Sequence, residues 1–349
     1  MQAGLNRSRL STFAWAMILA LVAIIGFAYV KWIPYYAKAF LAQSQHFIGD
    51  SIISGKASAA PSASWSAAVD YAIAYGQSIW KAMILGLILG SGIKVLLPSR
   101  WVSAVLGRLG FRNVIRGGLF AIPCMMCTCC AAPVAAGMRQ SRASVGSVVA
   151  WWLSNPLLNP ATLVFMGFVL GWDWAAFRIV FGIAMVLGIA YLAERYAEPG
   201  VINSTSQDLP VEVEAPTGNL LLRWVQEFMA LTIRLLPEYL ILVLLLGAAR
   251  AWLFPVFSAD DSFSWIVAMA LAGTLFVIPT AGEVPIVHAM VTLGMDAGPA
   301  AALIMTLPAV SLPSLVMLSS VFSLRIRLVI ASGVVLSGIV AGLIATLLF

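Results

Sequence analysis

The chain has 349 residues, of which 62% are hydrophobic and 10% are charged. An average soluble domain has about 45–50% apolar and roughly 25% charged residues, and the mean hydropathy of this chain is +0.98. This composition excludes a soluble globular protein and indicates a polytopic integral membrane protein. The formal net charge is +6, but the basic residues lie at the ends of apolar runs and form no basic stripe, so no nucleic-acid partner is expected.

The first apolar run, residues 13–30, follows Arg7 and Arg9. It is long for the core of a signal peptide and no small-x-small cleavage site follows it directly, so we expect a retained first span. A polar loop is expected over 31–70, and the polar segment 196–227 is interpreted as a cytoplasmic linker. Further continuous apolar stretches cover 79–97, 144–170, 175–193, 230–253, 297–322 and 328–348, and two stretches, 113–138 and 265–295, are interrupted by prolines.

The two halves of the chain resemble each other. Residues 119–123 read Leu-Phe-Ala-Ile-Pro and residues 275–279 read Leu-Phe-Val-Ile-Pro, an offset of 156. The prolines at 156 and 160 likewise recur at 308 and 313. The predicted organisation is a span and loop over 1–72, a first repeat over 73–195, the linker 196–227 and a second repeat over 228–349.

The proline-interrupted stretches either cross the membrane or form re-entrant helical hairpins. With hairpins, twelve basic residues face the cytoplasm and five face away; with full crossings the split is about ten to seven, so the positive-inside rule favours hairpins. The five facing away would be Lys31, Lys38, Lys56, Arg178 and Arg250. Each repeat then has three spans and a hairpin, an odd number of crossings, so the repeats are inverted. The predicted fold is all-α with inverted repeats whose broken helices meet at the midplane, which is typical of secondary transporters.

All four cysteines lie within seven residues, between Pro123 and Pro133. They are Cys124, Cys127, Cys129 and Cys130. Near-neighbour cysteines rarely meet disulfide geometry, whereas thiolates bind soft ions such as Cu(I), Zn(II), Hg(II) or trivalent arsenic. The pattern predicts a substrate or metal site formed by the four cysteines, with Cys127, Cys129 and Cys130 as the main ligands. Packing as small apolar residues is the alternative.

The matching break in the second half contains Glu283, followed by His288. A carboxylate at membrane depth is costly, so both residues are candidates for proton coupling. Capping of a half-helix by Glu283, and simple packing of His288, are the alternatives. A further polar break holds Asn155 and Asn159, which are candidates for substrate binding or for repair of a proline kink.

No phosphate loop, metalloprotease helix or nucleophile elbow is present in the sequence. We therefore expect neither an enzyme nor a cofactor.

The chain resembles bacterial permeases of the YraQ type, a family that includes the ArsP organoarsenical efflux permeases. The resemblance covers most of 73–349 and depends on Pro123 to Pro133, the following Val-Ala-Ala-Gly-Met-Arg, and Ser-Asn-Pro-Leu-Leu-Asn-Pro at 154–160. Cys127 and Cys129 match the Cys-Ser-Cys-Gly pattern of the family, Cys130 replaces its glycine, and Cys124 lies outside it. The resemblance implies an exporter of trivalent organoarsenicals in the bacterial inner membrane, or a permease of unknown substrate.

The predicted function is thus export of a thiophilic species, an organoarsenical or a soft metal ion, by proton antiport. The expected partners are this small substrate, protons and membrane lipid, and the sequence leaves a homodimer open. Two alternatives remain: a membrane subunit that binds or senses through its thiols without transport, and a structural subunit.

Overall fold

The computed structural model describes residues 2–55, 57, 59–197, 219–255 and 263–349, with side chains from residue 13 onward. Most of the predicted linker, Lys56 and the side chains of Arg7 and Arg9 lie outside the described residues. The described chain is helical apart from turns and one isolated bridge between Ser51 and Gly55. The all-α prediction is confirmed.

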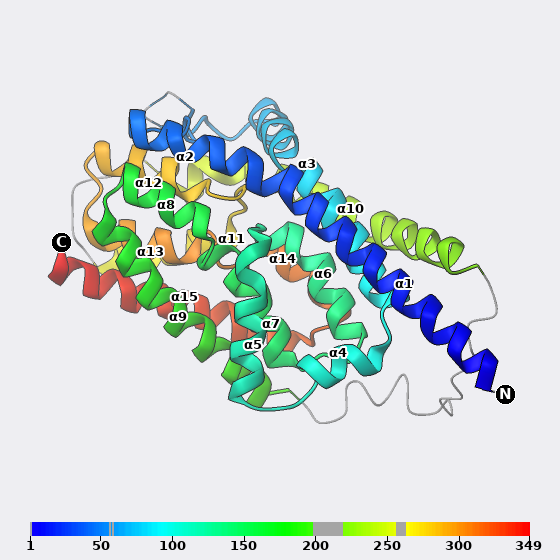
Figure 1. The fold of residues 1–349 in the computed structure, drawn as a ribbon. Coiled ribbons are helices and arrows are strands. Elements are labelled where there is room, and N and C mark those ends of the chain that lie inside the picture. The colour runs from blue at the N-terminus through cyan, green and yellow to red at the C-terminus, as the bar shows by residue number, and fades with distance from the viewer. Residues whose placement is uncertain (1, 56, 58, 198–218, 256–262) are drawn as a thin grey trace.

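The helices follow in chain order (Figure 1). Their bounds are α1 Gln2–Phe27, the π-helical η1 Ala28–Trp32, α2 Ile33–Gln45, α3 Trp65–Leu96, α4 Ser99–Leu106, α5 Phe111–Ala121, the 3-10 turn η2 Ile122–Cys124, α6 Thr128–Gln140, α7 Val145–Leu157, α8 Pro160–Val169, α9 Trp172–Arg195, α10 Leu220–Leu253, α11 Phe263–Leu275, α12 Glu283–Thr292, α13 Ala297–Thr306, α14 Leu312–Met317, the 3-10 turn η3 Leu318–Ser320 and α15 Leu324–Leu348.

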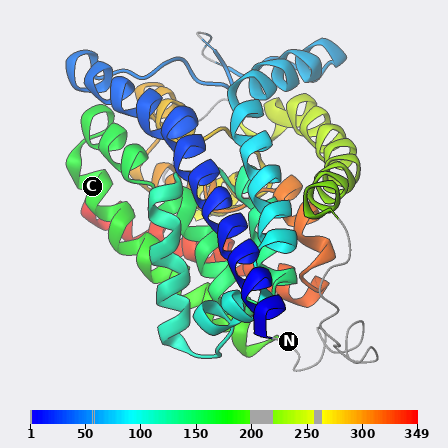
Figure 2. The ribbon, with the colours of Figure 1, turned by 45° about the vertical axis from the view of Figure 1, so that its right-hand side comes forward.

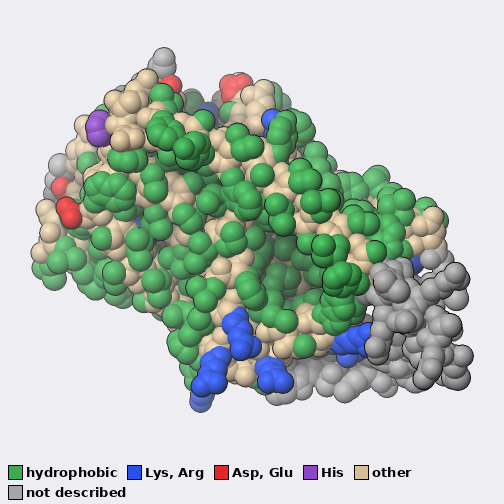
Figure 3. All heavy atoms as spheres, viewed as in Figure 1, with side chains coloured by type: hydrophobic (Ala, Val, Ile, Leu, Met, Phe, Trp, Pro, Cys, Tyr) green, Lys and Arg blue, Asp and Glu red, His purple; other side chains and the backbone are tan. Residues whose placement is uncertain are grey.

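Five helical segments in the described chain are long and apolar enough to cross a membrane. They are Phe13–Gln45, Trp65–Leu96, Trp172–Arg195, Leu220–Leu253 and Leu324–Leu348. Hydrophobic side chains cover the middle of the visible surface, and Lys and Arg gather at its lower edge (Figure 3). This distribution is that of a multi-pass membrane protein.

The first span is longer than the sequence predicted. The helix continues from α1 through η1 into α2 and ends at Gln45, so the first fifteen residues of the expected polar loop are helical. The left-handed conformation of His46 (φ 51°) ends it. In the view of Figure 2, α1 lies diagonally across the outside of the molecule, beside α3.

The first proline-interrupted stretch is two helices that begin and end at the same end of the molecule. The backbone N–H of Ser144, just after α6, donates to the carbonyl of Leu106, just before α5, at 2.8 Å. The chain therefore reverses direction between α5 and α6, around Met125, whose φ of 51° is left-handed. The second interrupted stretch has the same left-handed turn at Ala281, with φ 65°.

Glycines let α6 approach α3 closely. A Cβ added at Gly86 would overlap the carbonyl oxygen of Cys130, and one at Gly90 would overlap that of Pro133. Small residues allow such backbone contact between membrane helices. The cysteine-bearing turn is thus held against the long helix α3.

Two stretches expected to be continuous, 144–170 and 297–322, are each divided into two helices. The first breaks between α7 and α8, where the Asn159 side chain accepts hydrogen bonds from the N–H groups of Ala161 (3.0 Å) and Thr162 (3.4 Å). The second breaks between α13 and α14, where Ser311 and Ser314 form a capping box. Prolines at N1 or N2 of α8 and α14 favour the start of a new helix rather than continuation of the previous one.

Three of the five basic residues expected to face away from the cytoplasm lie inside the protein. Lys31, Arg178 and Arg250 are 5%, 0% and 7% exposed. Each has an internal partner: Lys31 a threonine hydroxyl, Arg178 a carboxylate, and Arg250 the ring of Tyr71 at 5.6 Å. These three charges therefore cannot be used in the positive-inside count to decide which side of the membrane a loop faces.

Candidate functional site

The thiols of Cys127 and Cys130 lie together at the start of α6. Cys127 is the residue before the first turn and Cys130 is the third residue of the helix, so both side chains occupy one face. Their sulfur atoms are 2.6 Å apart, and both residues are free cysteines, 3% and 0% exposed. This pair is the closest approach of thiols in the described structure.

The other two cysteines point elsewhere. The Cys129 sulfur lies 3.5 Å from the Ser311 hydroxyl of the second half, and that of Cys124 contacts the Phe120 carbonyl. Residues two apart on a helix do not share a face, which separates Cys129 from the pair. Within the described residues no three His, Cys, Asp or Glu side chains are grouped as metal ligands. The structure therefore brings together two of the four predicted ligands.

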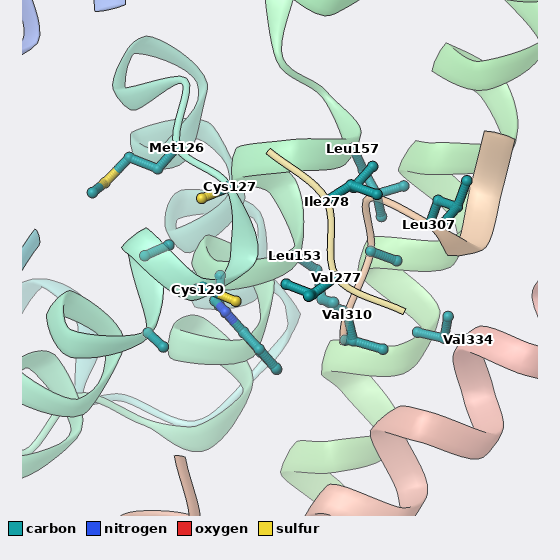
Figure 4. Packing of buried hydrophobic residues seen from close by; sticks show 14 of the residues in the cluster. Met126, Cys127, Cys129, Leu153, Leu157, Val277, Ile278, Leu307, Val310 and Val334 are labelled. Atoms are coloured by element: carbon teal, nitrogen blue, oxygen red, sulfur yellow. The ribbon is translucent and has the colours of Figure 1, made fainter. Parts of the chain in front are cut away.

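The broken segment of the second half lies opposite the thiol pair. Figure 4 shows Cys127 and Cys129 on the first hairpin, and Val277 and Ile278 on the extended segment between α11 and α12. A small cavity between the two breaks is lined by residues of both halves, among them Cys127, Thr128, Pro156, Thr280 and Glu283. It has room for about one water molecule.

Lys31 reaches this region from the first span. Its Nζ donates to the Thr280 hydroxyl at 2.8 Å and to the Tyr35 hydroxyl at 3.3 Å, and Thr280 lines the cavity together with Cys127. Sequence reasoning missed this role. A lysine that follows an apolar run reads as a charge at the membrane surface, and its contact lies 249 residues away in the chain.

Glu283 pairs with Arg178 in the interior. The carboxylate Oε1 lies 2.7 Å from Nη2 of Arg178, and the side chains are 2% and 0% exposed. The guanidinium also donates to the carbonyls of Pro156 (2.7 Å) and Leu157 (3.0 Å) at the end of α7. Sequence reasoning missed Arg178 as well, although an arginine inside the apolar run 175–193 is itself a signal of function.

The remaining predicted residues lie at the edges of the site. The Asn155 side-chain oxygen accepts from the backbone N–H of Met126 at 3.3 Å, and its amide donates to the Trp151 carbonyl at 2.9 Å. Asn155 thus links the cysteine turn to α7, while the amide nitrogen of Asn159 is buried without a hydrogen-bond partner. His288 is half-buried on α12.

Two buried tyrosines lie near the cysteines. The rings of Tyr75 and Tyr239 are 6.1 Å apart, and both phenols are buried without a hydrogen-bond partner. The sequence analysis did not single out these residues, because a tyrosine in an apolar run has no distinguishing pattern.

Comparison with known proteins identifies a family. The family described as predicted permease, ArsP_1, matches residues 11–167 and 126–347. The UPF0718 protein YraQ of Escherichia coli is 51% identical over 331 residues, 94% of this chain and 93% of that protein. The UPF0718 protein MJ0584 of Methanocaldococcus jannaschii is 21% identical over 334 residues, 76% of this chain and 90% of that protein. No solved structure matches.

Proposed function

Since this chain belongs to the ArsP_1 family of predicted permeases, a family of transporters rather than enzymes, we propose that it is a secondary transporter of the bacterial inner membrane. Its proposed cargo is a thiophilic species, a trivalent organoarsenical or a soft metal ion, which it exports in exchange for protons. The observation that carries the proposal is the pair of free thiols beside a cavity between two broken helices.

Thiol chemistry supports the cargo. Thiolate is a soft donor and favours soft ions over hard ones. A monoalkyl arsenical with trivalent arsenic takes two thiolates, which is the number that Cys127 and Cys130 supply. Cys129, near Ser311 and Tyr75, is proposed as a further ligand that receives or releases the cargo. A site with few ligands favours release, which a carrier requires.

Inverted repeats are proposed for the two halves. The corresponding helices α3 and α10 run antiparallel: the Trp224 indole near the start of α10 donates to Ser91 near the end of α3 at 3.0 Å, and Gly247 lies against Tyr71. The left-handed turns at Met125 and Ala281 are separated by 156 residues, the offset of the sequence repeat. Alternating access would then tilt one half against the other around the thiols.

The end of the molecule at which α5 begins is proposed to face the cytoplasm. Arg108, Arg112 and Arg116 are exposed there, and Arg142 is exposed at the end of α6. By the positive-inside rule such a concentration lies on the cytoplasmic side. The hairpin of the first half would then enter from the cytoplasm.

Glu283 is proposed to carry the exchanged proton, with His288 as a further carrier. As long as Arg178 holds the carboxylate, the charges of the pair are balanced inside the protein. A proton on Glu283 would remove that attraction and free the guanidinium to move with the α7 carbonyls. The proposal therefore couples proton uptake to movement between the two breaks.

Flux into inside-out vesicles tests the function. Vesicles containing the wild type should accumulate methylarsenite or a soft metal ion when a proton gradient is imposed. Replacing one thiol of the pair, Cys127→Ser, removes one of the two soft ligands. The transport rate should fall by about tenfold or more, which corresponds to a loss of about 1.4 kcal/mol. The matched control is Cys124→Ser, which alters a thiol outside the pair.

Binding without flux would overturn the carrier and favour the alternative, a membrane subunit that binds or senses through its thiols. Equal rates for wild type and Cys127→Ser would overturn the assignment of the site.

A further inference from the structure

Cys127 and Cys130 have the arrangement of a dithiol that can be oxidised. They form a Cys-x-x-Cys sequence at the start of a helix, and reactive dithiols occur in this setting. Their sulfur atoms are 2.6 Å apart and unbonded, closer than two sulfur atoms in van der Waals contact. The two sulfur atoms are therefore already neighbours before any oxidation.

The surroundings distinguish the two sulfur atoms. Cys127 lines the cavity between the breaks, which has room for about one water molecule, whereas Cys130 is fully buried and does not line the cavity. An oxidant that reaches the pair from the cavity would therefore meet Cys127 first. On the same cavity wall, the Thr280 hydroxyl accepts a hydrogen bond from the Lys31 ammonium group at 2.8 Å. One residue of the pair can therefore react first and the other can resolve the product.

We propose that Cys127 and Cys130 form a redox-active dithiol, which hydrogen peroxide converts into a disulfide that reversibly blocks the permease. The Cys127 sulfur attacks one peroxide oxygen; an S–O bond forms, the O–O bond breaks, and the second oxygen leaves as water. The Cys130 sulfur then attacks the Cys127 sulfur; the S–S bond forms, the S–O bond breaks, and the hydroxide leaves as a second water with the Cys130 proton. The two sulfur atoms lose two electrons in total, and peroxide gains them.

The disulfide would withdraw both thiols from the cargo site. This part of the inference rests on the proposed function, because it assumes that the pair binds cargo. The bond itself does not depend on transport. A reductant of disulfides, such as a phosphine or a dithiol, would restore both thiols of the site.

The experiment counts free thiols by mass. Purified full-length protein in detergent is reduced, freed of reductant, treated with one equivalent of hydrogen peroxide, and alkylated after denaturation. The wild type, with four cysteines, should take up four alkyl groups before oxidation and two afterwards, and peptide mapping should place the bond between Cys127 and Cys130. Cys130→Ser should form no disulfide and should lose only the Cys127 site, which peroxide converts to the sulfenic acid, whereas Cys129→Ser should lose two of three sites to the bond.

Four alkyl groups on the oxidised wild type would overturn the proposal, as would a bond mapped to Cys124 or Cys129. Mapping on the wild type keeps the test valid where a variant does not fold. Flux of cargo into oxidised vesicles tests whether the disulfide blocks the permease. The flux should fall on oxidation and recover after treatment with the phosphine. Unchanged flux in protein shown to carry the Cys127–Cys130 disulfide would overturn the proposed block. If no soft cargo is transported in either state, the proposed function fails while the count of thiols still decides the redox pair.

Discussion

At the scale of single residues, a few charged side chains lie inside this membrane protein, each beside an internal partner. Arg178 binds Glu283 and the carbonyl ends of α7 at once, so one guanidinium joins three elements: α9, α7 and α12. The carbonyls at the end of a half-helix carry partial negative charge, which attracts cations. Here a tethered cation occupies that position, and the carboxylate of the second half neutralises it.

Removing one partner of this pair should destabilise the protein strongly. Arg178→Met leaves the Glu283 carboxylate buried without its partner, and the expected loss in the free energy of unfolding is about 3–5 kcal/mol. The double variant, with Arg178→Met and Glu283→Met, removes both charges and should lose less than the first single variant. Thermal unfolding in detergent measures both. Losses that simply add would show that the two side chains do not stabilise each other.

At the scale of secondary-structure elements, close packing of α6 on α3 places the thiols. Gly86 and Gly90 face the first turns of α6, where the backbone of Cys130 and Pro133 leaves no room for a Cβ. Gly76 lies on the same helix with no atom within 4 Å of its added Cβ. The helix therefore contains both a test position and its own control.

Gly86→Ala should displace the start of α6. The expected cost is about 1–3 kcal/mol, the usual range for overpacking, and the alkylation rate of Cys130 in native protein should rise as the turn loosens. Gly76→Ala should leave the alkylation rate unchanged, and stability should remain equal or increase by up to about 1 kcal/mol because alanine favours helix. Equal behaviour of the two variants would argue against close packing as the constraint on the hairpin.

The proline pattern predicted the interrupted helices, because prolines act locally on the chain that contains them. The sequence predicts a polar break at Asn159 but no helix end there or at Ser311, since apolar residues on both sides conceal the interruption. The contacts of Lys31 and Arg178 depend on residues far away in the chain and could not be read from a local pattern. The separation of Cys129 from the pair has a local cause, the start of the helix at Thr128, and the sequence predicted no helix end at that residue.

At the scale of the whole molecule, the long helices of the two halves pack in antiparallel pairs. Beside α3 and α10, helix α9 packs along α15, with Gly333 against Ile189 and Phe349 stacked on Trp174 at 4.4 Å. The ends of the broken helices lie between these pairs, so the cavity is enclosed by both halves. The alternating access proposed above would move one half against the other around this cavity.

The orientation of this assembly leads to the last prediction. Arg142 follows the first hairpin and Asp173 lies in the first turn of α9, after the broken α7–α8 segment that is proposed to cross the bilayer, and both side chains are exposed. An impermeant maleimide added to intact cells should label Asp173→Cys and leave Arg142→Cys unlabelled, and inside-out vesicles should give the reverse. The wild type, whose own thiols are buried or half-buried, supplies the background. Labelling of both positions from the same side would mean that α7 and α8 do not cross the bilayer, and the proposed orientation of the hairpins would be wrong.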